Sequence, residues 1–258
     1  MTSATGELAG VRRLLEVMRR LRDPQGGCPW DRAQDSRSLA RYTLEEACEL
    51  IAAIETGDQS ALRDELGDLL FQVVFHSQLA NERGEYGFDD VAHAMADKLE
   101  RRHPHVFAGE SPGSWEELKA AERAARGAGG LLDDIPLTLP ALARASKLGK
   151  RAAQVGFDWS DAAGPRAKVL EELAEVDAAQ RGQGVLEDEI GDLLLAVNSL
   201  ARHLGVDAET ALRRANLRFE TRFRDMETLA ARRGLKLANL GPDALDTLWN
   251  DVKKGVQS

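Results

Sequence analysis

Two clusters of acidic residues recur in this sequence with nearly the same spacing. In the second cluster, Glu172 and Glu175 are three residues apart, and so are Glu189 and Asp192. Residues three apart share one face of an α-helix, so each pair places two carboxylates side by side. Clustered carboxylates beside an apolar run such as Leu193–Val197 lose hydration and repel one another unless a cation lies among them. The spacing therefore predicts a divalent metal site on a buried, apolar helix.

The first cluster contains Glu46, Glu49, Glu65 and Asp68, at offsets of 126 residues for the first pair and 124 for the second. Both copies continue into apolar residues, so a merely solvated acidic surface is the weaker interpretation. Carboxylate oxygens are hard ligands that suit Mg²⁺, with Mn²⁺ as an alternative. A ferritin-like di-iron site would need Glu-x-x-His pairs, which these positions lack. The duplication predicts two tandem repeats, each with its own metal ligands.

Cationic residues that could hold an anionic ligand accompany the second cluster. Lys168 precedes Glu172 by one helical turn, and Arg218 and Arg222 are four residues apart on one predicted helix face. Guanidinium forks match phosphate oxygens, so these residues are candidates for a phosphate clamp. A metal beside such a clamp is the arrangement used for phosphoryl chemistry. The sequence has no glycine-rich P-loop.

Composition excludes several other classes of protein. The net charge of −9 argues against a general nucleic-acid binder. No apolar run approaches the roughly 20 residues of a membrane span, and Met1–Gly6 lacks the layout of a signal peptide. Cys28 and Cys48 form neither a disulfide framework nor a zinc pattern. We therefore expect a cytoplasmic protein without nucleic-acid or membrane partners.

Helical periodicity extends along the chain and no segment reads as a strand, so the predicted fold class is all-α. The expected helices span about residues 8–22, 38–55, 61–82, 88–102, 115–126, 139–154, 165–181, 185–204 and 207–233, with a tail helix from Pro242. Cys28–Asp31 is expected as a tight loop, and Trp30 within it as either a core residue or a ligand contact. A Gly-, Ser- and Pro-rich stretch separates predicted repeats at 1–126 and 127–258. Each hairpin needs further helices to complete a four-helix bundle, which predicts a homodimer.

Several motifs together resemble the MazG family of nucleoside triphosphate pyrophosphohydrolases, in an all-α superfamily that also contains dimeric dUTPases. They are Glu-Glu-x-x-Glu at 45–49 and 171–175, Glu-x-x-Asp at 65–68 and 189–192, the loop Gly27–Asp31, and the segments Arg101–Phe107 and Val155–Trp159. The resemblance covers nearly the whole chain. It implies hydrolysis of ribo- and deoxynucleoside triphosphates to monophosphate and pyrophosphate with Mg²⁺.

The resemblance also implies roles for individual residues, mainly in the C-terminal repeat, which is the catalytic half in this family. Metal ligands would be Glu172, Glu175, Glu189 and Asp192, phosphate ligands Lys168, Arg218 and Arg222, and Trp249 would lie near the nucleotide. Arg218 stands where the family commonly has Lys, which keeps the charge but changes the geometry of the clamp.

The mechanism that we expect is attack of a metal-activated water on the α-phosphate, with Glu172 or Glu175 as the general base. Sequence does not choose between these two glutamates, and it does not show whether the first repeat is active. Two other functions remain open. One is a narrower enzyme that removes dUTP, dCTP or damaged nucleotides, and the other is a non-catalytic module that binds nucleotides for regulation.

Overall fold

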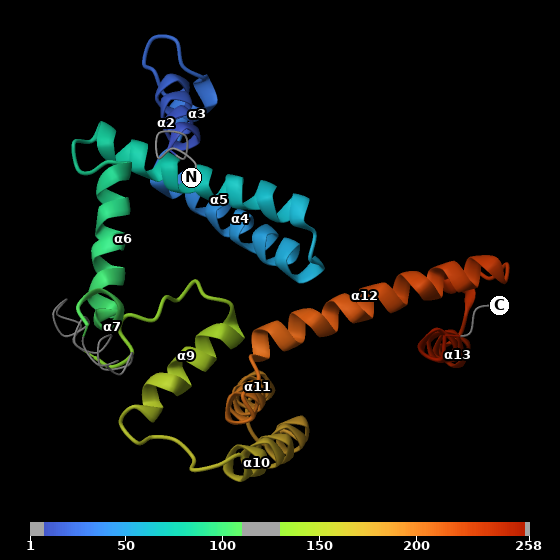
Figure 1. The fold of residues 1–258 in the computed structure, drawn as a ribbon. Helices are drawn as coiled ribbons and strands as arrows, with labels where there is room; N and C mark the ends of the chain where they lie inside the picture. Colours follow the sequence, from blue (N-terminus) through green and yellow to red (C-terminus); the bar gives the residue numbers. More distant parts are fainter. Residues whose placement is uncertain (1–7, 110–129, 256–258) are drawn as a thin grey trace. The chain divides into compact units, whose positions relative to one another are not determined.

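The computed structural model describes residues 8–109 and 130–255, and all regular structure within these ranges is helical (Figure 1). This confirms the all-α prediction. The chain divides into two compact units, Met1–Ala121 and Glu122–Ser258. The predicted helix over 115–126 and the predicted repeat boundary at 126/127 fall outside the described ranges. Among the helices that are described, none combines the length and apolarity needed to cross a bilayer.

The first unit is built around an antiparallel helical hairpin (Figure 1). Its helices are α2 (Ala9–Leu21), α3 (Pro29–Ala33), α4 (Ser36–Thr56), α5 (Gln59–Glu82), α6 (Phe88–Arg102) and α7 (Pro104–Phe107). The α4–α5 hairpin carries the first acidic cluster, and α2 and α6 pack against α5.

Local signals fix where the first hairpin turns. Asp35 caps α4 by accepting the backbone N–H of Ser38, which stabilises the helix N-terminus. At the other end Gly57 adopts φ +74°, the left-handed conformation that ends helices and favours glycine. Asp58 then accepts the N–H groups of Ser60 and Ala61 to start α5. The tight turn brings the acidic faces of α4 and α5 together.

The core of the first unit lies where α2 packs on the α4–α5 hairpin. Its fully or nearly fully buried residues are Met18, Leu39, Val74, Phe75 and Leu79. Phe75 and Val74 have no exposed surface.

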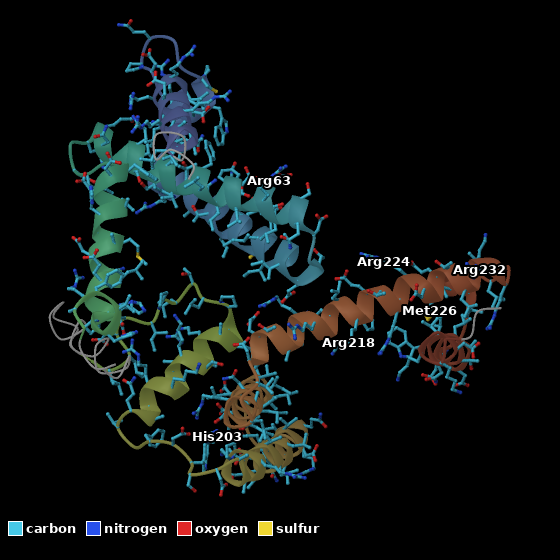
Figure 2. All side chains as sticks on the ribbon, viewed as in Figure 1. Arg63, His203, Arg218, Arg224, Met226 and Arg232 are labelled. Carbon is cyan, nitrogen blue, oxygen red and sulfur yellow. The ribbon has the colours of Figure 1, made fainter. Side chains whose placement is uncertain are left out.

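The second unit repeats this plan with α9 (Ala141–Ala153), α10 (Ala163–Gln180), α11 (Leu186–His203) and α12 (Ala208–Arg232), followed by η1 (Leu237–Asn239) and α13 (Pro242–Lys253). The α10–α11 hairpin carries the second acidic cluster, and α9 packs on α11. The distal half of α12 forms a separate small core with α13, in which Met226 and Leu248 are buried (Figures 1 and 2).

Two predicted boundaries are wrong. Three of the four residues of the expected Cys28–Asp31 loop belong to α3, because Pro29 at the first helical position presets the backbone angle. Trp30, on this short helix, is half exposed and contacts the edge of Tyr42, so it is not a core residue. Helix α10 begins at Ala163 instead of Pro165, and Asp161 accepts the Ala163 N–H.

The predicted burial of the apolar run on α11 is also wrong for this chain by itself. Leu194, Leu195 and Val197 are 45–53% exposed, and Leu170 on α10 is 64% exposed. The α10–α11 hairpin can bury only the faces on which its two helices meet each other or pack against α9 and the start of α12. The remaining apolar surface is uncovered by the described residues of this chain.

Candidate active site

The second acidic cluster gathers three carboxylates from both helices of its hairpin. Glu172 of α10 and Glu189 and Asp192 of α11 each offer an oxygen, and these oxygens lie within 4.8 Å of one another. The burial decreases across the group, from buried Glu172 to half-buried Glu189 and exposed Asp192. Such a set of oxygens, closed on one side and open to solvent on the other, is suited to a hard divalent cation.

Lys168 provides a fixed positive charge at the inner side of this cluster. Its Nζ lies 2.6 Å from Glu172 Oε1 and 2.7 Å from Glu171 Oε1. Glu172 is only 3% exposed, and its second oxygen, Oε2, is buried without a hydrogen-bond partner among the described residues. A buried carboxylate oxygen with no donor carries a large desolvation cost, so it fits the position of a metal ligand.

Glu175 lies beside this group and differs from Glu172 in its ionisation. The Lys168 ammonium group holds the pKa of Glu172 below its ordinary value. Hydrogen bonding to Glu172 raises the pKa of Glu175. Glu175 is also the more exposed of the two carboxyls.

A cavity of about 530 Å³ adjoins the second cluster. Lys168, Glu172 and Asp192 line its polar side. The remaining lining comes from the segment before α9, from α9, from the loop before α10 and from α11, and includes Leu132, Leu148, Trp159, Leu195, Ala196 and Asn198. The volume is in the range of small-molecule sites, and the mixture of apolar walls with a few polar groups is typical of them.

An ion-pair network fixes the loop that forms one wall of the cavity. Both oxygens of Asp158 accept hydrogen bonds from the Arg202 guanidinium, at 2.6 and 2.7 Å. His203 contacts the carbonyl oxygen of Trp159 at 3.2 Å and packs edge-on against its indole. On its other side Trp159 covers Gly164, where a Cβ atom would stand 2.1 Å from the ring. Glycine at this position therefore lets Trp159 pack against the start of α10.

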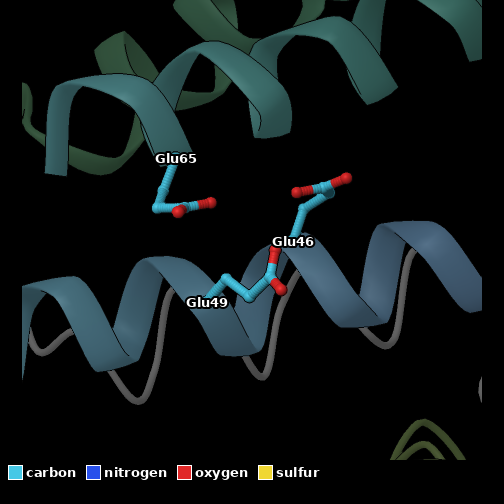
Figure 3. Close-up of side chains that lie close together, drawn as sticks. All are labelled: Glu46, Glu49 and Glu65. Atoms are coloured by element: carbon cyan, nitrogen blue, oxygen red, sulfur yellow. The ribbon is translucent and has the colours of Figure 1, made fainter. Parts of the chain in front are cut away.

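The first acidic cluster has the same hairpin geometry. Glu46 and Glu49 of α4 face Glu65 of α5, and their nearest oxygens lie within 4.8 Å of one another (Figure 3). Burial, followed by the charge of Asp68 and then of Glu49, raises the pKa of Glu46. The pKa of Glu65 is raised as well, again by burial first. Tyr42 occupies the position of Lys168 in the first repeat. It stands four residues before Glu46, as Lys168 stands four residues before Glu172.

The predicted phosphate clamp is only partly assembled. Lys168 lines the cavity, whereas Arg218, Arg222 and Trp249 are not among its lining residues. Arg218 lies on α12 (Figure 2) and is exposed. Arg222, on the same helix, is half buried. Trp249 packs against Phe219, with ring centroids 5.3 Å apart, at the edge of the α12–α13 core. The roles of these three residues stay predictions.

Sequence analysis did not single out Asn198, Arg202 or Leu132 as site residues. Asn198 is 2% exposed on α11 and hydrogen-bonds with Ser146 of α9 at 2.9 Å. The signal that could have identified Asn198 and Arg202 is their position after the apolar run of α11, because a buried polar or charged side chain needs a partner inside the fold. For Leu132, which lies in the second unit before α9, the sequence offered no signal.

Comparisons with known proteins agree with this architecture of paired acidic hairpins. The MazG nucleotide pyrophosphohydrolase domain matches residues 34–107. Over 255 residues the chain is 49% identical to the nucleoside triphosphate pyrophosphohydrolase of Escherichia coli K12, covering 95% of this chain and 97% of that protein. It is 44% identical over 249 residues to the MazG nucleoside triphosphate pyrophosphohydrolase of Thermotoga maritima, with 95% and 96% covered. A Mycobacterium tuberculosis nucleoside triphosphate pyrophosphohydrolase shares 36% over 220 residues, 81% of this chain and 57% of that protein.

The all-α fold and the carboxylate hairpins therefore define a hydrolase of the nucleotide pyrophosphohydrolase class. The identity extends through both repeats and nearly the full length of the Escherichia coli and Thermotoga maritima proteins. This chain belongs to the MazG family.

Proposed function

We propose that the second repeat hydrolyses nucleoside triphosphates to the monophosphate and pyrophosphate. One observation carries the proposal: Glu172, buried and bonded to Lys168, presents a partnerless oxygen to a carboxylate cluster that borders a 530 Å³ cavity. The names of the relatives, which describe this activity, support it. Both ribo- and deoxynucleotides are included in the proposal.

The residues of the second cluster fit a divalent cation, and we propose Mg²⁺, with Mn²⁺ as a substitute. Glu172, Glu189 and Asp192 would hold it, since their oxygens already converge and all are hard ligands. When bound, such an ion lowers the pKa of a coordinated water and neutralises phosphate charge. Lys168 keeps Glu172 ionised and so ready to bind a cation.

Glu175 is our candidate for the general base. It lies outside the group of three converging oxygens and is open to solvent. Its raised pKa brings it closer to the working range of a base than the Lys168-paired Glu172. In this role Glu175 takes the proton of the water that attacks the α-phosphorus, while pyrophosphate leaves.

The cavity is suited to the nucleoside part of the substrate. Its apolar walls can cover a base and sugar, and the half-exposed indole of Trp159 offers a ring face or edge to a base. Lys168 and the carboxylates lie at the polar side, where the triphosphate and its cation would be. Arg218, Arg222 and Trp249 are proposed to contact the substrate from α12 and α13.

Pyrophosphate release measured across the common ribo- and deoxynucleotides, with and without Mg²⁺, tests the proposal. We expect turnover of several nucleotides, lost when the metal is chelated. Glu172→Gln should abolish turnover while the helical content and unfolding midpoint stay close to those of the wild type. Turnover confined to dUTP or dCTP would favour a narrower enzyme, and metal-dependent binding without turnover would favour a regulatory module.

Two variants on α12 test whether this helix contacts the phosphates of the substrate. Arg222→Ala should raise KM for the nucleotide, because a half-buried guanidinium is removed. Arg224→Ala is the control, since Arg224 is exposed and ion-paired with Glu220 at 3.2 Å (Figure 2). Equal kinetics of the two variants would contradict a role for Arg222.

We also propose that the enzyme is a homodimer. The uncovered apolar side chains of the α10–α11 hairpin (Leu170, Leu173, Ile190, Leu194, Leu195 and Val197) support this, since a second hairpin would complete a four-helix bundle. Light scattering on the wild type should give twice the chain mass. Leu194→Glu should shift the mass toward the monomer, and a monomeric wild type would overturn the proposal.

A further inference from the structure

The segment that enters α9 from the first repeat forms an ordered turn at its described end. The Asp133 carboxylate accepts the backbone N–H of Gly130 at 2.6 Å, and Ile135 donates its N–H to the Leu132 carbonyl at 3.2 Å. Ile135 is 5% exposed, so its side chain anchors the turn in the second unit. This end of the connection between the repeats is therefore part of the second unit.

Arg151 of α9 holds this turn from the other side. Its guanidinium donates to the carbonyl oxygen of Leu131 at 3.1 Å and to the Asp134 carboxylate at 2.8 Å. The Arg151 side chain is only 17% exposed, so these bonds are largely shielded from solvent. Helix α9 also contributes Leu148 and Ala152 to the cavity, so Arg151 links the turn to a cavity wall.

Leu132 is the residue that this turn presents to the cavity. Its side chain is among the lining residues and is 45% exposed. Five residues later Leu137 is 82% exposed and does not line the cavity. A partly exposed apolar side chain at a cavity gains burial when an apolar part of a ligand fills the space.

We propose that Leu132, held in place by Arg151, is a specificity-determining residue for the nucleoside part of the substrate. This inference depends on the proposed function and adds that the segment before α9 forms part of the substrate site. Leu132, an aliphatic side chain with no group that could bond to a phosphate, contacts the base or sugar. Arg151 is a positioning residue that acts through the turn.

Kinetics on the full-length chain with ATP test the proposal. Leu132→Ala should raise KM about three- to tenfold, the loss expected for one partly buried aliphatic side chain, with kcat changed less than about twofold. Leu137→Ala is the matched control and should match the wild type. An unchanged KM in Leu132→Ala would overturn the inference.

Inhibition by inorganic tripolyphosphate separates a nucleoside contact from a general structural effect. Tripolyphosphate has the phosphates but no base or sugar, so its inhibition constant should be the same for wild type and Leu132→Ala. A parallel weakening of ATP and tripolyphosphate would show a structural role and overturn the inference. Leu132→Trp provides a second measurement, because it narrows the cavity and should raise KM for purine nucleotides more than for pyrimidine nucleotides.

Arg151→Gln tests the positioning step. It should raise KM in the same direction as Leu132→Ala, and Arg151→Lys should recover part of the loss by keeping the charge. Lys147→Gln, an exposed change on the same helix, is the control. Turnover by Glu172→Gln would contradict the proposed function itself. If only the present inference fails, Glu172→Gln is inactive and Leu132→Ala has the wild-type KM.

Discussion

In the second repeat, Lys168 stands one turn before the buried Glu172 and bonds to it at 2.6 Å. At the same place in the first repeat, Tyr42 stands before Glu46. The pKa values of the two glutamates are consequently shifted in opposite directions, because Lys168 lowers the pKa of Glu172 whereas burial and neighbouring acids raise the pKa of Glu46. The same four-acid pattern thus gives two different electrostatic environments.

The space beside the acids differs as well. Seven residues after Asp68 stands Phe75, which is fully buried in the core between α2 and α5. Seven residues after Asp192 stands Ser199, which lines the 530 Å³ cavity between α9 and α11. The MazG domain match covers residues 34–107, which lie in the first repeat. The second cluster has both a lysine and a 530 Å³ cavity beside it.

Removal of the proposed general base should give the largest difference in activity between a variant of the second repeat and the matching variant of the first. Glu175→Gln should reduce kcat by about 1,000-fold or more, since a general base contributes on the order of 10²–10⁴. Glu49→Gln, at the matching position, should leave the rate within about twofold. Pyrophosphate release by the purified variants measures both. Equal losses would contradict the assignment of catalysis to one repeat.

Removing the lysine should have the next largest effect. Lys168→Met leaves Glu172 buried without its cation, so the carboxyl should take up a proton and lose affinity for Mg²⁺. We expect a loss of about 10- to 100-fold in kcat/KM, in line with changes to groups that orient metal ligands. The Mg²⁺ concentration for half-maximal rate should rise in parallel. Tyr42→Phe in the first repeat should change neither value, and an Mg²⁺ requirement unchanged in Lys168→Met would refute this role.

Exchanging the side chains of Ser199 and Phe75 tests whether side-chain volume at this position accounts for the difference between the repeats. Ser199→Phe places the first repeat's side chain into the second cavity and should raise KM for ATP about tenfold or more. The reciprocal Phe75→Ser should leave activity unchanged but destabilise the first repeat by about 3–5 kcal/mol, as for other large-to-small core changes. Urea unfolding and steady-state kinetics on the two variants give both numbers. Ser199→Ala, which keeps the cavity open, should behave as the wild type.

Sequence predicted the helices well, because they depend on local periodicity and spacing. The hairpin turn follows from Gly57 and Asp58, whereas the converging oxygens belong to Glu172, Glu189 and Asp192 and not to Glu175, so the i, i+3 spacing alone did not define the group. The cavity could not be predicted in this way. Its existence depends on side-chain volumes at positions distant in sequence, such as Ser199 on α11 and Leu132 before α9.

Exposure was the property that sequence predicted least well. Leu194 and Leu195 were expected to be buried because the helix is apolar nearly all round, yet about half of each is exposed. Periodicity shows that a face is apolar but not which element covers it, and the covering element need not belong to the same chain.

The smallest expected effect concerns two ion pairs, one in each repeat: Arg202 with Asp158 and Arg22 with Glu82. Arg202 bonds to both oxygens of Asp158, which borders the cavity, whereas Arg22 bonds to both oxygens of Glu82, which does not line it. Each arginine holds the pKa of its carboxyl below the ordinary value. A depressed pKa stabilises the folded state above the unfolded-state pKa, near 4, and this contribution disappears as pH falls through the folded-state value.

Asp158→Asn should therefore lower the free energy of unfolding at pH 7 by about 1–2 kcal/mol. The difference from wild type should shrink as the pH falls below 4, where the wild-type carboxyl also becomes neutral. Because Asp158 fixes the Trp159 wall, the variant should in addition raise KM for ATP about two- to fivefold. Glu82→Gln should show the same pH-dependent loss of stability without the change in KM. Urea titrations at pH 3 to 7, combined with kinetics at pH 7, distinguish these outcomes. A rise in KM for Glu82→Gln as large as that for Asp158→Asn would show that the ion pair supports the fold in general and not the cavity wall.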